Sequence, residues 1–290
     1  MNTILVLTDF SKKSKYAAET AIQLAYKTNA DILLFNAYSR YPYLPSAEYI
    51  AWPPEYYDIF KNESKIQIII EKRRIESLIN QHKEKVRKIN VTYVTAEGTA
   101  AENLPTLLEK GNISIIVIGG RSKTLGNFLF GDQMNQIISK ANCPLLIISS
   151  KNLNLNIKNA VFATDLAPNN IKAIKYLIKL SLAFHFHLHI CHVSYTSIFL
   201  SHLNDNKRIT EFVKAVEEIG FPKLTYKNIE GTYIAQEIEN FCRTTHADLL
   251  AIVQKDHSIF HKILQESPAR DIIRHQKKPI LVLPERWINK

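Results

Sequence analysis

The chain has 290 residues, more than one hydrophobic core usually supports, so two domains of ordinary size are expected. Apolar residues make up 46% and charged residues 22%, as in soluble globular proteins, and no apolar run approaches the roughly 20 residues that span a bilayer. The net charge of +10 is spread over both halves and favours anionic partners, but no run resembles a nucleic-acid-binding motif, which argues against nucleic-acid and membrane partners.

Strand and helix patterns alternate along the first half. A short β-rich run that ends at Asp9 favours a first strand over a secretion signal and indicates a cytoplasmic protein. Ser11 is expected to cap the next helix. Near-continuous apolar strands separated by helices predict a buried parallel sheet covered on both faces. The predicted strands are 3–8, 30–38, 91–96, 114–119 and 143–149, and the predicted helices are 11–28, roughly 60–88, 100–110 and 132–141.

The second half repeats the first. Thr164 and Asp165 align with Thr8 and Asp9, and both pairs are followed by an amphipathic stretch and an apolar run. Glu-Gly-Thr occurs at 97–99 and again at 230–232, and the apolar run 143–149 matches 278–284. Because the matches keep their order and nearly their spacing, we expect two copies of one domain, 1–150 and 151–290.

One edge of the first predicted sheet carries the candidate binding residues. Thr8 and Asp9 follow the first strand, and Gly119 and Gly120 follow the fourth. Ligands of open parallel sheets bind at the carboxyl ends of the strands. The loop after Gly119 contains glycines and cations and leads into a helix, which is typical of a phosphate-binding loop.

These residues resemble the universal stress protein family over both halves of the chain. The resemblance rests on "ILVLTDFS", "ADILLFNAY", "EGT" and "IVIGG…LFG…CPLLII", and it is to the tandem two-domain form. It implies an α/β fold with two tandem Rossmann-like domains of the adenine nucleotide alpha hydrolase-like type. Each would be a five-stranded parallel sheet, order 3-2-1-4-5, flanked by helices. The family pairs domains through their last strands, in homodimers or within one tandem chain.

Many family members bind ATP through a loop G-x2-G-x9-G-[ST], and an Asp at the end of the first strand contacts the nucleoside. Asp9 occupies that place here, and Gly119 and Gly131 match the first and third glycines. The resemblance therefore implies ATP or AMP, optionally with Mg²⁺, in the first domain. The site residues that it implies are Thr8, Asp9, Ala37, Ile118, Gly119, Gly120, Arg121, Ser122, Gly131, Asp132 and Gln133.

The first loop departs from the family pattern. It is one residue short, so Arg121 or Ser122 stands where the second glycine belongs, and Asp132 replaces the final hydroxyl residue. A carboxylate about 4 Å from a phosphate charge costs about 4 kcal/mol at an effective dielectric of about 20. Arg121 and Lys123 would offset this repulsion. Asp132 would also stabilise the first turn of a helix.

The second loop departs further, because 253–273 contains no glycine and Glu266 replaces the third one. Without glycine, side chains crowd the place where a phosphate would approach. We therefore expect the ligand in the first domain. Asp165 nevertheless persists in the second copy, which suggests that this Asp also ties the loop or caps the helix.

For the cysteines and the histidine-rich strand, a structural role is preferred over metal binding or reactivity. Cys143, Cys191 and Cys242 are widely spaced and are expected to be buried, reduced thiols. His185, His187 and His189 alternate along a predicted strand, which allows a zinc or copper site or a pH sensor, but half-buried strand histidines are the preferred interpretation.

Function is expected to be binding and not catalysis, since no nucleophile or metalloprotease motif is found. The preferred hypothesis is a stress-response switch, in which a ligand orders the loop 120–131 and the Tyr- and Pro-rich segment 38–60 and changes a surface for a protein partner. The alternatives are slow ATP hydrolysis and a purely structural interaction module whose nucleotide sites have decayed. Pairing of two chains as a homodimer is left open.

Overall fold

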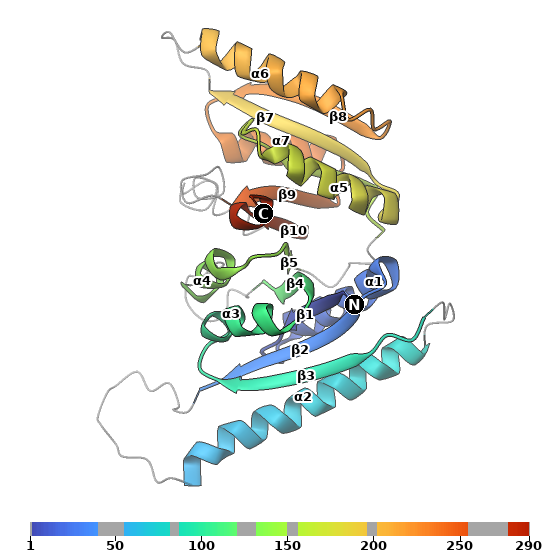
Figure 1. The fold of residues 1–290 in the computed structure, drawn as a ribbon, viewed down its shortest axis with the longest axis vertical. Helices are drawn as coiled ribbons and strands as arrows, with labels where there is room; N and C mark the ends of the chain where they lie inside the picture. Colours follow the sequence, from blue (N-terminus) through green and yellow to red (C-terminus); the bar gives the residue numbers. More distant parts are fainter. Residues whose placement is uncertain are drawn as a thin grey trace, which may run out of the picture. The chain divides into compact units, whose positions relative to one another are not determined.

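The computed structural model describes residues 2–39, 55–81, 87–120, 132–149, 156–195, 202–254 and 278–289 (Figure 1). Contacts divide the chain into two compact units. The first comprises Met1–Cys143 and Lys151–Asn154, and the second comprises Pro144–Ser150 and Leu155–Lys290. Each unit is an α/β sheet with flanking helices, which confirms the predicted fold class. None of the helices in the described ranges is long and apolar enough to cross a membrane.

The sheet of the first unit has the order β3-β2-β1-β4, and the pairs β1–β2, β1–β4 and β2–β3 are parallel. Burial explains this arrangement, since Ile4–Leu7 of β1 is at most 4% exposed. A strand buried on both faces belongs at the centre of a parallel sheet. The strands are β1 (Thr3–Leu7), β2 (Asp31–Tyr38), β3 (Val91–Glu97) and β4 (Ile113–Gly119).

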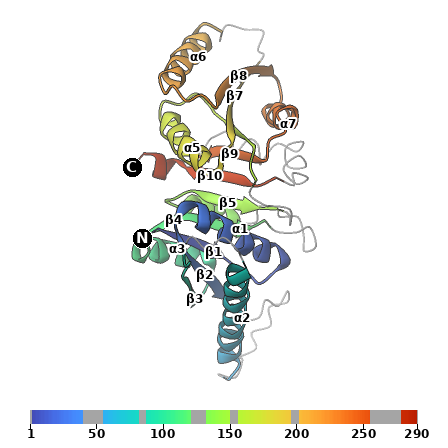
Figure 2. The ribbon, with the colours of Figure 1, turned by 90° about the vertical axis from the view of Figure 1, so that its right-hand side faces the viewer.

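Helices α1 and α2 cover one face of this sheet, and α3 covers the other (Figure 2). As predicted, Ser11 caps α1 by accepting a 3.3 Å hydrogen bond from the backbone N–H of Ser14. Helix α2 begins earlier than expected, at Glu55, directly after two prolines, a residue type favoured at helix starts. The helices are α1 (Lys12–Thr28), α2 (Glu55–Gln81), α3 (Ala100–Lys110) and α4 (Asp132–Lys140).

The second unit has the strand order β5-β10-β9-β6-β7-β8. Its pairs are parallel except β10–β5, which is antiparallel and matches Ile280 with Ile147. The last strand of the first sequence repeat thus pairs with the last strand of the second. Since β5 is grouped with the second unit by its contacts but with the first repeat by its sequence, the domain boundary at 150 remains a proposal. The strands are β5 (Leu145–Ile148), β6 (Asn159–Ala163), β7 (His187–Tyr195), β8 (Leu224–Gly231), β9 (Leu249–Gln254) and β10 (Ile280–Pro284).

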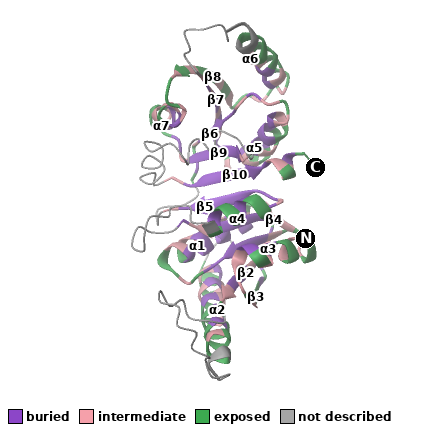
Figure 3. Ribbon diagram, turned by 90° about the vertical axis from the view of Figure 1, so that its left-hand side faces the viewer, coloured by how far each residue is buried: buried purple, intermediate pink, exposed green. Residues whose placement is uncertain are grey.

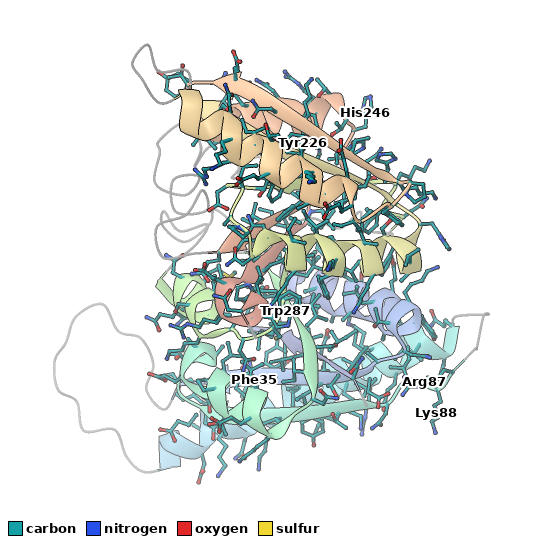
Figure 4. All side chains as sticks on the ribbon, turned by 45° about the horizontal axis from the view of Figure 1, so that its top comes forward. Phe35, Arg87, Lys88, Tyr226, His246 and Trp287 are labelled. Atoms are coloured by element: carbon teal, nitrogen blue, oxygen red, sulfur yellow. The ribbon has the colours of Figure 1, made fainter. Side chains whose placement is uncertain are left out.

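In the second unit, α5 and α6 lie on one face of the sheet and α7 on the other (Figure 2). A short helix that follows β10 carries Trp287, which Figure 4 labels, and packs against α5. There Trp287 meets Tyr176 edge-on, with ring centroids 4.8 Å apart. The helices are α5 (Asn170–Phe184), α6 (His202–Glu217), α7 (Ile234–Thr244) and α10 (Glu285–Ile288).

The strands form the core of each unit, as the buried residues in Figure 3 show. All three cysteines are buried and none is joined in a disulfide, which confirms their prediction as reduced thiols in the apolar core. Burial raises the pKa of the Cys191 thiol, and it raises the pKa of Cys242 to about 11. Both thiols are therefore protonated and unreactive at neutral pH.

Candidate functional site

Three parallel strands of the first unit end at the same edge of the sheet. The register pairs Leu7 of β1 with Phe35 of β2 and with Ile118 of β4. The residues that follow these positions lie at the carboxyl ends of the strands, where open sheets bind ligands. The structure thereby brings these predicted site residues to one edge: Thr8, Asp9, Ala37, Ile118, Gly119 and Gly120.

The remaining predicted site residues belong to the loop and the helix that follow β4. Arg121, Ser122 and Gly131 lie outside the described residues. Asp132 begins α4, but its side chain also lies outside them, and Gln133 in the first turn of α4 is exposed. The phosphate-binding loop therefore stays a prediction, as does the switch that involves the segment 38–60, of which 40–54 is not described.

A tight turn links β1 to α1. Phe10 adopts a left-handed conformation with φ of 62°, which costs about 1 kcal/mol or more for a residue other than glycine. The hydroxyl oxygen of Thr8 accepts a 3.1 Å hydrogen bond from the Phe10 N–H, and Asp9 Oδ1 accepts one of 3.1 Å from the Ser11 N–H. These two bonds hold the strained turn, in which Asp9 directly follows the carboxyl end of β1.

Asp9 is ionised in this setting. Partial desolvation raises its pKa, but hydrogen bonds from Ser11 and Ser14 outweigh that effect, so the pKa lies below its ordinary value. The side chain is exposed at the edge. It can therefore accept hydrogen bonds from the hydroxyl groups of a ligand, or contribute to binding a cation.

Asn36 and Ser64 complete the turn and were not identified from the sequence. The side-chain amide of Asn36 donates a 2.7 Å hydrogen bond to the carbonyl oxygen of Thr8, and the hydroxyl of Ser64 donates one of 2.6 Å to Asn36 Oδ1. Both side chains are buried, and the bond between them satisfies the Ser64 hydroxyl and the side-chain oxygen of Asn36. The available signal was a polar residue within an otherwise apolar strand.

Gly119 has a packing reason to be glycine. A Cβ atom built on it would lie 2.5 Å from the carbonyl carbon of Lys13 and 2.6 Å from the backbone nitrogen of Ser14. Helix α1 therefore approaches β4 too closely for any side chain at this position. This glycine serves the packing of the sheet edge whether or not a phosphate binds there.

The second unit forms the same turn at Thr164 and Asp165. Leu166 has a φ of 62°, and its N–H donates a 3.0 Å hydrogen bond to the hydroxyl oxygen of Thr164. Asp165 Oδ1 accepts hydrogen bonds from the Ala167 N–H and from the Asn170 side chain, at 3.2 and 2.8 Å. The expectation that this Asp also ties the loop is confirmed for the second copy.

Two basic side chains contact the second turn. His192 Nδ1 lies 2.9 Å from the carbonyl oxygen of Thr164, which is the position that Asn36 holds on Thr8. Because a carbonyl only accepts, Nδ1 carries the proton. The Arg208 guanidinium donates a 3.0 Å hydrogen bond to the carbonyl oxygen of Asp165.

The histidine-rich strand is half-buried, as its preferred interpretation predicted. His187 and His189 of β7 stack with ring centroids 4.5 Å apart, and His185 caps α5 instead of continuing the strand. The ring nitrogens of His189 lie 2.9 Å from the Thr225 hydroxyl and 3.3 Å from the Asn159 side-chain oxygen. Within the described ranges, no group of three or more potential protein ligands is placed to hold a metal.

The repeated sheet and its repeated strand-end turn define a tandem Rossmann-like α/β protein. The sequence model of the universal stress protein family matches residues 1–149 and 156–284. The chain belongs to the universal stress protein family, in its tandem form, as the sequence motifs predicted. No curated protein matches the chain.

Solved structures share the fold along the whole chain. A universal stress protein from Archaeoglobus fulgidus DSM 4304 is 17% identical, with 97% of this chain and 96% of that chain covered and a TM-score of 0.71. A functionally unknown protein from Pseudomonas aeruginosa PAO1 is 14% identical, with coverages of 99% and 93% and a TM-score of 0.63. These similarities establish the fold.

Proposed function

We propose that this universal stress protein acts by binding an adenine nucleotide, ATP or AMP, at the strand edge of its first repeat, and that binding controls a protein partner. The observation that carries the proposal is the combination of an ionised, exposed Asp9 with Gly119 and Gly120 at the ends of adjacent strands. The proposed place of action is the cytoplasm, which three buried cysteines without a disulfide favour.

The two groups would bind different parts of the nucleotide. The carboxylate of Asp9 accepts hydrogen bonds, and the hydroxyls of a ribose supply them. Glycines after β4 let backbone N–H groups come close to phosphate oxygens, and the N-terminus of α4 adds a favourable partial charge. Mg²⁺, if it accompanies ATP, would reduce the repulsion between the phosphates and the carboxylate of Asp132.

The second repeat lacks the glycines. Its register pairs Ala163 with Ile252, as Leu7 pairs with Ile118 in the first repeat, so Val253 and Gln254 stand where Gly119 and Gly120 stand. Val253 is buried at 7% exposure, so this position of the second repeat carries a buried side chain where the first repeat has a glycine. Binding is therefore proposed for the first repeat alone.

Calorimetric titration with ATP, ADP and AMP, with and without Mg²⁺, tests the proposal. The wild type should release or absorb heat with at least one nucleotide, and Asp9→Asn should weaken binding by tenfold or more, about 1.4 kcal/mol. Asp165→Asn, the same change in the second repeat, is the matched control and should bind as the wild type does. Absence of heat and of any thermal shift at millimolar nucleotide would overturn the proposal.

A second candidate is a structural interaction module without a nucleotide. It is favoured by the hydrogen bonds of Asp165, which show that the turn keeps its Asp in a repeat without the glycines. The Asp9→Asn variant separates the two candidates. Under the structural alternative it would lower the stability of the first unit, and nucleotide would have no effect on either protein.

A further inference from the structure

Helix α2 has apolar residues on two opposite faces. Ile68 and Ile75 face the sheet and are fully buried. Ile59, Ile66 and Ile70 are 49%, 58% and 53% exposed, and at 3.6 residues per turn they lie on the opposite side of the helix. Figure 3 shows exposed residues along this outer side of α2. Three large aliphatic side chains in a row on a helix surface indicate an interaction site.

Six residues on the exposed side of α2 follow one another at alternating spacings of four and three positions, and we call this row the α2 seam. Such spacing is the pattern of helices that pack along one another. Every member of the seam is exposed, and neither of its two charged members forms an ion pair within the described part of the chain. The α2 seam consists of Ile59, Glu63, Ile66, Ile70, Arg73 and Ser77.

The seam is complementary to itself when two copies run antiparallel. With the two-fold axis beside position 68, Ile66 of one copy meets Ile70 of the second. In the next layer outward, Glu63 meets Arg73 of the second copy, and each contact occurs twice because the interface is two-fold symmetric. The outermost layer places Ile59 against the small side chain of Ser77.

Other pairings of the same seam lose this match. Parallel helices in register would oppose Glu63 to Glu63 and Arg73 to Arg73, which is unfavourable twice over. An antiparallel pair whose axis lies between 64 and 65 would place Ile66 against Glu63 of the second copy. Of these three arrangements, the one about position 68 joins apolar to apolar and acid to base.

We propose that α2 is a homodimer interface, in which the α2 seams of two chains pack antiparallel about position 68. The contact is made by one helix from each chain, so it is smaller than the roughly 800 Å² per partner of a standard interface. The dimer is therefore weak and forms at high protein concentration. The α2 seam includes none of the residues of the proposed nucleotide site, so this proposal does not depend on the proposed function.

Sedimentation velocity over a concentration series of the full chain tests the interface by charge reversal. Glu63→Arg and Arg73→Glu should each abolish the dimer, because each places like charges in the Glu63–Arg73 layers. An equimolar mixture of the two variants should restore it, because every layer then joins Arg to Glu across the interface. The double variant Glu63→Arg/Arg73→Glu should also dimerise.

Lys65→Glu is the control, since it reverses an exposed charge of α2 outside the seam. It should leave the dimer unchanged, and circular dichroism should show the same helix content in all variants. A wild-type chain that stays monomeric throughout the series would overturn the proposal. So would a dimer that persists in both single variants, because it would then use another surface.

Discussion

Asn36 and Thr8 are joined by a 2.7 Å hydrogen bond from the side-chain amide to the backbone carbonyl oxygen, at the end of two neighbouring strands. The amide holds the turn from inside the unit, since Asn36 is buried and its side-chain oxygen accepts a hydrogen bond from the Ser64 hydroxyl. In the second repeat His192 makes the same contact with Thr164. The turn that presents Asp9 is thus anchored by a side chain from the next strand.

Replacement of Asn36 should destabilise the first unit. Asn36→Leu removes the donor to the Thr8 carbonyl and leaves the buried Ser64 hydroxyl without its acceptor, which we expect to cost about 2–4 kcal/mol. Ser64→Ala removes a hydroxyl but leaves the bond to Thr8, and it should cost about 1 kcal/mol. Urea unfolding followed by circular dichroism compares the two. Equal stability of Asn36→Leu and the wild type would contradict the anchoring role.

Gly119→Ala should also lower the free energy of unfolding, by about 1–3 kcal/mol, because the new methyl group would lie 2.5 Å from the Lys13 backbone. Gly111→Ala is the control, since its Cβ would come no closer than 3.1 Å to any atom and its φ of −111° suits alanine. Thermal unfolding of both variants measures the difference. A stable Gly119→Ala protein would show that α1 and β4 can separate.

Arg74 is expected to stabilise the packing of α2 on α1. Its guanidinium binds the buried Glu71 at 2.8 Å and Glu19 of α1 at 2.7 Å. Arg74→Ala would leave the carboxylate of Glu71, which is 3% exposed, without its counter-charge and should cost about 3–5 kcal/mol. Lys72→Ala breaks a partly exposed pair with Glu76 and a contact with the Tyr93 ring, and it should cost about 1 kcal/mol or less. Urea midpoints of the two variants report the contrast.

The His187–His189 stack should make stability depend on pH. Desolvation and the neighbouring His187 lower the pKa of His189 in the folded protein. The unfolded chain therefore binds a proton first, at about pH 6.5, and the folded state loses stability as the pH falls below that value. Above it, the contribution is constant.

Urea unfolding between neutral pH and about pH 5 measures this dependence, which His189→Gln should reduce. The exposed His246 serves as the control, replaced by Asn because its φ of 49° is left-handed. His246→Asn should retain the wild-type slope. An unchanged slope in His189→Gln would assign the pH dependence to other groups.

Prediction from the sequence succeeded where one local pattern decided the outcome. The buried strands follow from apolar runs such as 3–8, their order was implied by the family resemblance, and the role of Ser11 follows from the chemistry of helix starts. The bond between Asn36 and Ser64 could not be predicted, because it joins residues 28 positions apart that only the fold brings together. Gly119 was assigned to phosphate binding, but its contact with α1 depends on a helix position that no motif specifies. The short helix α10, which ends in a contact between Trp287 and Tyr176, has too few residues for periodicity to reveal.

The antiparallel pairing of β5 with β10 affects how this tandem chain can be dissected. A fragment cut at the sequence repeat, 151–290, lacks β5. The backbone N–H and carbonyl groups of β10 that face β5 would then have no partners, and such exposed strand edges are prone to aggregation. A fragment that starts at Pro144 would carry its own covering strand. The sequence repeat and the compact unit therefore begin at different residues, because the unit includes the seven residues 144–150 that precede the repeat.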